Sequence, residues 1–161
     1  MSGIDLSFVS GKEKFNYRVC AVILSESKLL AMHDERSPYY YLPGGRVQMG
    51  ETAEAAVVRE VQEELEITPE IIRPLWLNQA FFTEDVDGLH YHELCLYFLM
   101  DISHTDLLSK GEKFTLLERH HTHKFEWLPF ERLEREYFYP LFLKKEIFHL
   151  PEALTLRTEL E

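Results

Sequence analysis

The feature that most constrains this chain is a cluster of carboxylates on one predicted helix. Residues 52–65 are rich in alanine and favour a helix, and Glu60, Glu63 and Glu64 fall within about one turn of it. Because residues at i, i+3 and i+4 share a helix face, the three carboxylates lie within an arc of about 100°. Like charges held this close repel one another, and a hard divalent cation offsets the repulsion while binding carboxylate oxygens. The pattern predicts a metal-dependent enzyme, and a solvated acidic helix face is the plainer alternative.

The opposite side of the same segment is apolar. Val58, Val61 and Leu65 recur at helical spacing and fall on a different side from Glu60 and Glu63. One face of the helix is therefore expected to dock on a sheet while the other presents carboxylates.

A glycine-rich loop comes directly before the helix. Gly44 and Gly45 permit backbone dihedrals, and a close approach to a ligand, that other residues do not allow. Standing alone, the pair would indicate a plain turn between a strand and a helix. Beside the carboxylate helix, we interpret it as part of the same site.

Residues 45–67 resemble the signature of the Nudix family, G-x5-E-x7-R-E-U-x-E-E-x-G-U, in which U is aliphatic. The matching residues are Gly45, Glu51, Arg59, Glu60, Val61, Glu63, Glu64 and Ile67. One fixed position differs, because Glu66 stands where the family has a glycine. So many fixed polar positions make the match specific, unlike a lone glycine motif. The segments 42–45 and 125–129 also look like the family, so the resemblance extends over most of the chain.

The resemblance implies a fold and a ligand set. The implied fold is an α+β protein, an α/β/α sandwich with a mixed β-sheet between helices, and a mixture of strands with few helices agrees with it. The implied ligands of Mg²⁺ or Mn²⁺ are the Gly44 carbonyl, Glu60, Glu64 and, directly or through water, Glu63. Arg59 is implied to orient a signature glutamate by a charge-assisted hydrogen bond, although spacing alone would favour an ordinary surface salt bridge.

Glu51 and Glu66 carry two smaller expectations. Glu51 lies near the helix start, where the helix dipole favours an acid, so its position alone indicates a cap. The resemblance implies that it instead supports the structure or the metal ligands from outside. Glu66 resists the left-handed conformation that the family glycine allows. We therefore expect the helix to end differently by about one residue, without loss of metal binding.

The chemistry implied by the resemblance is hydrolysis of a phosphoanhydride in a nucleoside diphosphate linked to another moiety. Metal ions would lower the pKa of a bound water, and a general base must take its proton. The family does not determine where the base lies. We place Glu63, Glu64, Arg59 and Glu118 in the catalytic set, with Glu118 as the loop candidate for the base and Glu93 as a second candidate. A solvated loop acid is an equally good interpretation of Glu118.

The substrate stays open at this level. A sugar nucleotide such as ADP-ribose and a noncanonical nucleoside triphosphate are both consistent with the signature. Two other functions occur on the same fold: a sensor that binds a nucleotide without cleaving it, and an isomerase that acts on an isoprenoid diphosphate. The intact signature glutamates argue against the sensor, and no extra residues for the isomerase are recognisable.

Composition bounds the remaining possibilities. With 161 residues, of which 45% are hydrophobic, the chain fits a single domain over residues 1–161. A net charge of −11 argues against nucleic acid as a partner. No signal peptide or membrane-spanning run is recognisable, so a cytoplasmic protein is expected. Cys20 and Cys95 lie in apolar runs and are expected to be buried free thiols rather than a disulfide.

The other elements follow from local patterns. Residues 105–122 are expected to be polar and irregular, residues 130–145 helical with an interruption at Pro140, and residues from 154 onward a helix or a frayed tail. The expected strands are residues 15–24, 28–33, 71–83, 89–101 and 125–128, with a hairpin turn around Asp87 and Gly88, and residues 39–42 are expected to be a short extended piece.

Histidines and aromatic residues are the last candidates. His121 and His123 would share a strand face, and we assign neither of them to the metal. Tyr39 and Phe81 are candidates for stacking on a nucleobase, although core packing is the commoner role. The aromatic patch at residues 136–142 is expected to be either core or a contact in a homodimer.

Overall fold

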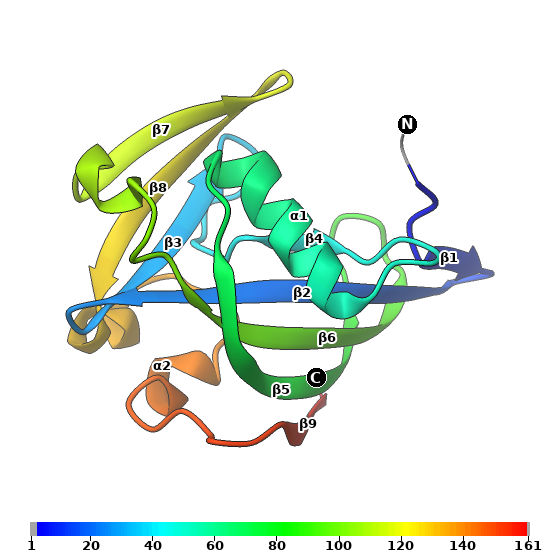
Figure 1. The fold of residues 1–161 in the computed structure, drawn as a ribbon. Coiled ribbons are helices and arrows are strands. Elements are labelled where there is room, and N and C mark those ends of the chain that lie inside the picture. Colours follow the sequence, from blue (N-terminus) through cyan, green and yellow to red (C-terminus); the bar gives the residue numbers. More distant parts are fainter. Residues whose placement is uncertain (1–2, 161) are drawn as a thin grey trace.

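The computed structural model describes residues 3–160 and shows a mixed β-sheet between helical layers (Figure 1). The strands are β1 (Ser7–Ser10), β2 (Glu13–Ser25), β3 (Lys28–Asp34), β4 (Gly44–Arg46), β5 (Glu70–Thr83), β6 (His90–Asp101), β7 (Lys113–Glu118), β8 (His121–Pro129) and β9 (Thr155–Leu160). The α-helices are α1 (Ala53–Leu65) and α2 (Leu143–Glu146), and the 3₁₀ helices are η1 (Leu107–Lys110) and η2 (Phe130–Arg135). The expected α+β class with a mixed sheet is confirmed.

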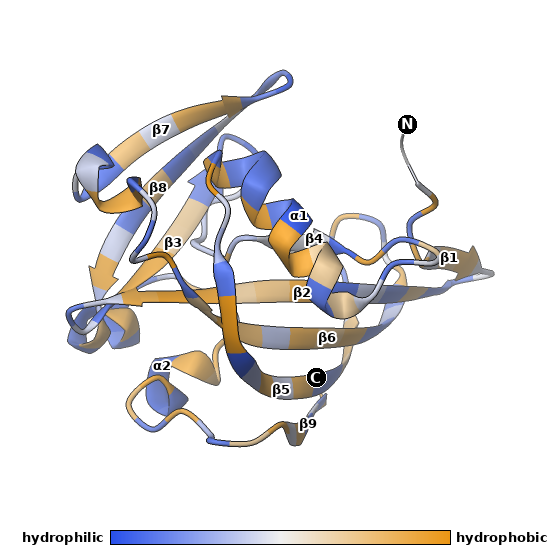
Figure 2. Ribbon diagram, viewed as in Figure 1, coloured by the Kyte–Doolittle hydropathy of each residue, from blue (hydrophilic) through white to orange (hydrophobic). Residues whose placement is uncertain are grey.

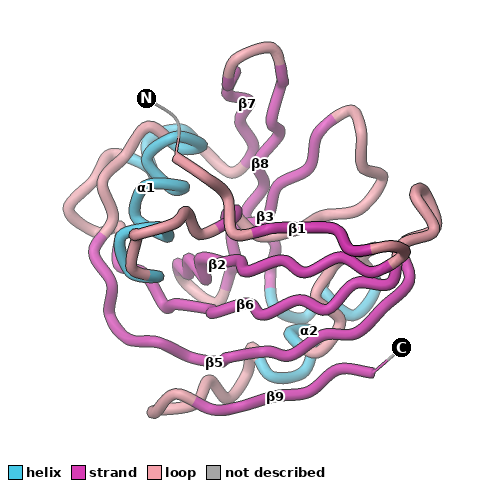
Figure 3. The backbone as a smooth tube through the Cα atoms, turned by 90° about the vertical axis from the view of Figure 1, so that its right-hand side faces the viewer, coloured by secondary structure: helices cyan, strands magenta, loops and turns pink. Residues whose placement is uncertain are grey.

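The strand order across the sheet is β7-β8-β3-β2-β6-β5-β9, and β1 and β4 also pair with β2. The β2–β6 and β5–β9 pairs are parallel, and the other pairs are antiparallel. Strands β1, β2, β6, β5 and β9 lie side by side in Figure 3. The sheet is thus organised around β2, which contacts both halves.

The two halves of the sheet diverge where β2 ends. Strands β2 and β3 pair only at Leu24–Leu29 and Ser25–Lys28, whereas β2 pairs with β6 along eleven residue pairs. Glu26 and Ser27 form the connecting turn, and both have positive φ (49° and 61°), as a two-residue hairpin requires. The strands β3, β8 and β7 therefore swing away from β6 and form a separate wall (Figure 1).

Helix α1 covers one face of the sheet. Thr52 caps its first turn by accepting a hydrogen bond from the Ala55 N–H at 3.1 Å, so the cap is Thr52 and not Glu51. Val57, Val61 and Leu65 are fully buried against the sheet, and burying each side chain stabilises the fold by about 1.5–3 kcal/mol. The expected division into an apolar and an acidic face is confirmed for Val61 and Leu65, whereas the expected Val58 is only partly buried and Val57 takes its place in the core. Apolar colour concentrates in the middle of the central strands in Figure 2.

The opposite face of the sheet packs against η2, α2 and the segment between them. Its core combines sheet residues with Leu133, Phe138, Leu143 and Ile147. Within the expected 136–142 patch, Phe138 is therefore core, while Tyr137 and Tyr139 are 54% and 42% exposed.

The end of α1 corrects an expectation. The helix ends at Leu65, and Glu66 itself adopts the left-handed conformation (φ 58°, ψ 34°) and donates its N–H to the Gln62 carbonyl. The chain turns here as it would at a glycine, and Leu65 and Ile67 on either side are both buried in the core. The expected shift of the helix end does not occur.

Two further expectations are wrong and one is only partly right, for reasons of long-range pairing. Residues 113–118 are strand β7 rather than irregular, because they pair with β8 in register from Lys113–Glu126 to Glu118–His121. Residues 130–145 are helical at both ends, in η2 and at the start of α2, but the interruption spans residues 136–142, because residues 137–139 are held extended beside Tyr40 and Pro140 follows. Residues 155–160 add to β5 as a parallel strand.

Two other observations concern the thiols and membranes. Cys20 and Cys95 are buried free thiols with their sulfurs 3.6 Å apart, as expected. Among residues 3–160, no helix has the length and apolar character to cross a bilayer.

The conformation of Glu66 predicts the effect of restoring glycine. A non-glycine residue in the left-handed region costs about 1 kcal/mol, so Glu66→Gly is expected to raise the free energy of unfolding by about 0.5–1 kcal/mol. Urea denaturation measures the change. Glu66→Ala is the control, because it removes the charge but keeps the strain, and equal stabilisation by both variants would contradict the prediction.

Candidate metal centre and active site

Glu64 is held against the glycine loop. The Gly44 N–H donates to Glu64 Oε1 at 2.9 Å, and the Glu64 side chain is buried. Gly44 sits opposite Cys20 on β2, and because its N–H points to Glu64, the pair is a non-hydrogen-bonded one. The Gly44 carbonyl therefore also points away from β2, toward the side on which α1 lies. This places a carbonyl oxygen beside a buried carboxylate.

Glu60 packs directly on Gly45. A Cβ atom at Gly45 would lie 2.4–2.5 Å from the carboxyl atoms of Glu60, so only glycine leaves room for this side chain. The loop and helix thus meet at two points, Gly44 with Glu64 and Gly45 with Glu60. Both carboxylates face the loop, as the metal-centre hypothesis requires.

Arg59 organises the acidic groups around it. Its guanidinium donates to both oxygens of Glu51, at 2.7 and 3.0 Å, to Glu60 Oε1 at 2.9 Å and to the Arg46 carbonyl at 3.0 Å. Glu51 in turn accepts from the Gln48 N–H at 3.0 Å. Arg59 therefore ties the loop to α1 and orients Glu60, and Glu51 supports the loop rather than the helix terminus.

Glu63 is placed differently from Glu60 and Glu64. Its side chain is 42% exposed, and its Oε1 lies 3.4 Å from the Arg59 guanidinium. Within residues 3–160, the carboxylates of Glu60, Glu63 and Glu64 do not form a group with all ligand atoms within 4.8 Å of one another. The structure therefore brings Glu60 and Glu64 together at the loop, while Arg59 draws Glu63 toward itself.

The surroundings of these carboxylates shift their pKa values upward. Burial raises the pKa of Glu60 to about 7, against the attraction of Arg59 and with help from the charges of Glu63 and Glu118. Burial and the charge of Glu60 raise the pKa of Glu64 well above its usual range, although the Gly44 hydrogen bond opposes this. Two neighbouring carboxyls thus resist ionisation unless a positive charge joins them.

This donor set fits a hard divalent cation. Glu60, Glu64 and the Gly44 carbonyl present oxygen atoms to one side of the loop, and oxygen is the preferred ligand of Mg²⁺ and Mn²⁺. The second oxygen of Glu64, Oε2, accepts no hydrogen bond among the described residues. Glu63 would complete the shell only by turning away from Arg59 or through a water molecule.

Glu118 lies near the same region, on the wall formed by strands β3, β8 and β7. It is the last residue of β7, and its Oε1 lies 3.1 Å from Nε2 of His123 on β8. Its charge raises the pKa of both Glu60 and Glu64, which places its carboxylate within electrostatic range of them. Glu93 does not lie near these carboxylates, because it accepts a hydrogen bond from Asn16 on the sheet face opposite α1.

A polar group beside Glu118 was not expected from the sequence. Asp34 is buried and accepts three hydrogen bonds from Arg36, which also contacts His121, and Tyr41 approaches Asp34 at 3.5 Å. His121 and His123 share a strand face, as predicted. The apolar alternation of residues 114–117, read as a strand, would have revealed a hairpin that joins Glu118 to the histidines.

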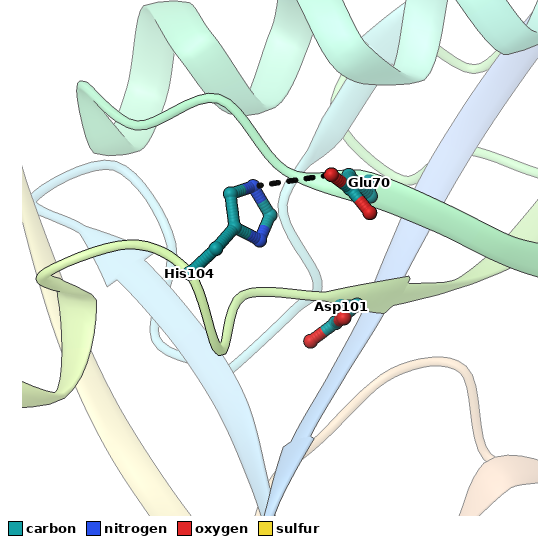
Figure 4. A group of neighbouring side chains, drawn as sticks. All are labelled: Glu70, Asp101 and His104. Carbon is teal, nitrogen blue, oxygen red and sulfur yellow. Dashed lines mark ion pairs between the residues drawn. The ribbon is translucent and has the colours of Figure 1, made fainter.

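A second group of metal-binding residue types lies at the start of β5 and the end of β6. Glu70, Asp101 and His104 have one ligand atom each within 4.8 Å of one another, and His104 points toward Glu70 (Figure 4). Glu70 is 72% exposed, and the His104 Nε2 also contacts the Thr68 carbonyl at 3.0 Å. The group could hold a metal ion, but its residues lie outside the signature at residues 45–67.

The two aromatic candidates separate in space. The Tyr39 ring contacts those of Tyr41, Tyr137 and Tyr139, with ring centroids 5.1–6.1 Å apart. Burial, Asp34 and the charge of Glu64 raise the pKa of Tyr41, so the cluster lies near the acidic site. Phe81 instead stacks near His92 in an open hollow of about 620 Å³. None of the predicted metal ligands or catalytic residues lines that hollow, so Tyr39 is the better placed of the two.

The two glycines predict different outcomes when each becomes alanine. A Cβ at Gly44 would lie 2.1 Å from the Val19 carbonyl oxygen, so Gly44→Ala is expected to destabilise the fold by about 1–3 kcal/mol. Gly45→Ala displaces only a side chain, and it should leave stability nearly unchanged while weakening Mn²⁺ affinity by about 10- to 100-fold. Thermal unfolding and Mn²⁺ titration calorimetry test this contrast, which fails if Gly45→Ala binds Mn²⁺ normally.

The raised pKa of Glu60 predicts how the stability of the metal-free protein depends on pH. The folded state binds this proton with a pKa of about 7, whereas the ordinary value is 4.5. Between these values the folded state holds more protons, so the stabilisation is present below about pH 4.5 and is lost as the pH rises to about 7. In EDTA, the free energy of unfolding of the wild type minus that of Glu60→Gln should therefore decrease between about pH 5 and about pH 8. An unchanged difference would contradict the assignment.

Comparisons with known proteins agree with the geometry. The profile of the NUDIX domain matches residues 14–147. An ADP-ribose pyrophosphatase of Methanocaldococcus jannaschii is 32% identical over 87 residues, which are 52% of this chain and 49% of that protein. An 8-oxo-dGTP diphosphatase of Escherichia coli is 68% identical over 28 residues, 17% of this chain and 22% of that protein. The chain thus spans about half or less of the length of the curated relatives it matches.

The fold comparison gives the same answer. The crystal structure of a mutator MutT protein from Bacillus halodurans superposes with a TM-score of 0.58, covering 89% of this chain and 90% of that chain. At 16% sequence identity, this similarity concerns the fold alone.

Proposed function

The chain belongs to the Nudix family, and we propose that it is a divalent-metal-dependent hydrolase that cleaves a phosphoanhydride bond in a nucleoside diphosphate derivative. The observation that carries the proposal is the double contact of the loop and α1. Glu64 bonds to Gly44, and Glu60 fills the space over Gly45. A solvated acidic helix face would need neither contact.

Gly44, Glu60 and Glu64 would hold the cation, with Glu63 as the fourth ligand. When bound, a divalent ion neutralises charge on the diphosphate oxygens and lowers the pKa of the attacking water. Arg59 keeps Glu60 oriented by its hydrogen bond at 2.9 Å and links it to Glu51. These residues position the diphosphate, and the proton still needs an acceptor.

We propose that Glu118 accepts this proton. Its carboxylate comes from the wall opposite α1 and lies within electrostatic range of Glu60 and Glu64. The oxygen of a water molecule attacks one phosphorus, and Glu118 accepts the proton that the water loses. The anhydride P–O bond then breaks, and the leaving phosphate oxygen keeps the electron pair.

Two substrate classes are supported by relatives. The similarity to an ADP-ribose pyrophosphatase favours a sugar nucleotide, and it extends over half of the chain. The similarity to an 8-oxo-dGTP diphosphatase favours a nucleoside triphosphate, but it is confined to 28 residues. The sugar nucleotide is therefore the first substrate to test.

Substitution of Glu64 tests the mechanism. Glu64→Gln keeps the size and a hydrogen-bond acceptor for the Gly44 N–H but removes the charge, so kcat/KM should fall by at least about 100-fold, or about 3 kcal/mol. Phosphate release from ADP-ribose and nucleoside triphosphates with Mg²⁺ or Mn²⁺, in a coupled phosphatase assay, measures the effect. Gln62→Glu is a matched control on the outer side of α1.

The outcomes separate the candidate functions. Full activity in Glu64→Gln would exclude the proposed mechanism. Tight nucleotide binding by the wild type without any turnover would favour the sensor.

A further inference from the structure

We propose that His123 is a positioning residue that holds Glu118 in place for proton transfer. This inference rests on the proposed function, in which Glu118 receives the proton of the attacking water. His123 is not expected to touch the substrate, because its contact is with Glu118.

The contact itself assigns the tautomer of the ring. His123 Nε2 lies 3.1 Å from Glu118 Oε1, and an ionised carboxylate can only accept a hydrogen bond. With Glu118 ionised, as a general base must be, Nε2 carries a proton and donates its N–H to Glu118. Its Nδ1 is buried and finds no partner among residues 3–160, so no second hydrogen bond competes for the ring.

The ring is held more firmly than the carboxylate. His123 is 6% exposed and lies on the middle strand of its wall, opposite Asp34 on β3 and Leu116 on β7. Sheet pairing on both sides and the neighbouring Phe125 ring restrict where the imidazole can point. His123 thus offers a fixed donor inside the wall.

Glu118 lacks such support of its own. It is the final residue of β7, beside a two-residue turn in which Arg119 has positive φ (57°), and its side chain is 25% exposed. Among the described residues, its carboxylate has one hydrogen-bond partner, His123. Fixing a free glutamate side chain costs up to about 2 kcal/mol of rotamer entropy. The histidine supplies a bond that selects one orientation before substrate arrives.

The orientation so selected is the useful one. Strand β7 contacts α1, and Glu118 shares a face of β7 with Leu116, which packs against the core beneath α1. From this face the charge of Glu118 raises the pKa of both Glu60 and Glu64. A glutamate released from His123 could turn into solvent at the hairpin tip. His123 therefore determines how often the base lies over the diphosphate, which affects kcat more than substrate binding.

Two substitutions of His123 test this role. His123→Leu removes the donor and should lower kcat by about 10-fold with KM nearly unchanged. His123→Gln replaces Nε2–H by an amide donor and should recover most of that loss. His120→Leu is the matched control: it lies on the same hairpin, but His120 is exposed at the turn, so wild-type kcat is expected.

A double variant separates positioning from a general structural effect. If His123 acts through Glu118, His123→Leu should cause no further loss of kcat in a Glu118→Gln background. A readout without turnover accompanies it: ¹⁵N spectra of the histidine side chains should show the Nε2–H tautomer for His123. Its signal should shift in Glu118→Ala.

Each outcome decides the matter. Three results would overturn the positioning role and leave the hydrolase intact. The first is wild-type kcat in both His123 variants, and the second is the same fold loss of kcat from His123→Leu in the Glu118→Gln background as in the wild type. The third is a His123 ¹⁵N signal that does not shift in Glu118→Ala. A wild-type protein that releases phosphate from no substrate overturns the proposed function, and the positioning role falls with it.

Discussion

The close approach of α1 to the β4 backbone is the constraint on which the site depends. Gly44 uses its N–H for Glu64, and Gly45 leaves the space that Glu60 fills. Gly45 must lack a side chain because Glu60 fills that space, whereas a Cβ at Gly44 would meet the Val19 carbonyl oxygen. The helix must also carry its two acids one turn apart. The apolar face of α1, buried on the sheet, supplies the stabilisation that holds these acids near each other.

The site also requires that the negative charge of its carboxylates be partly neutralised, and Arg59 neutralises some of it. Buried carboxylates raise each other's pKa, as Glu60 and Glu64 do here. Arg59 bonds to Glu60 and Glu51 and so offsets repulsion at one end of the cluster. Among residues 3–160, Glu64 accepts a hydrogen bond only from the Gly44 N–H, and the negative charge that stays beside the Gly44 carbonyl favours a cation.

The divergence of the sheet supplies the opposite wall. Because β2 and β3 pair at only two positions, the β3–β8–β7 half swings away from the rest of the sheet and forms a second wall, in which β7 contacts α1. Glu118 and His123 belong to that hairpin. The site is thus assembled from a helix and a loop that are close in sequence, and from a wall that depends on pairing far along the chain.

This division explains what the sequence by itself determined. Helix α1, its two faces and the loop that meets it follow from residues 42–66, because periodicity and glycine placement act over a few turns of chain. Only the tertiary structure decided that Glu66 takes the left-handed conformation, that residues 113–118 and 155–160 are strands, and that His123 reaches Glu118. Those features depend on partners distant in sequence, and no local pattern encodes which strand a segment will pair with.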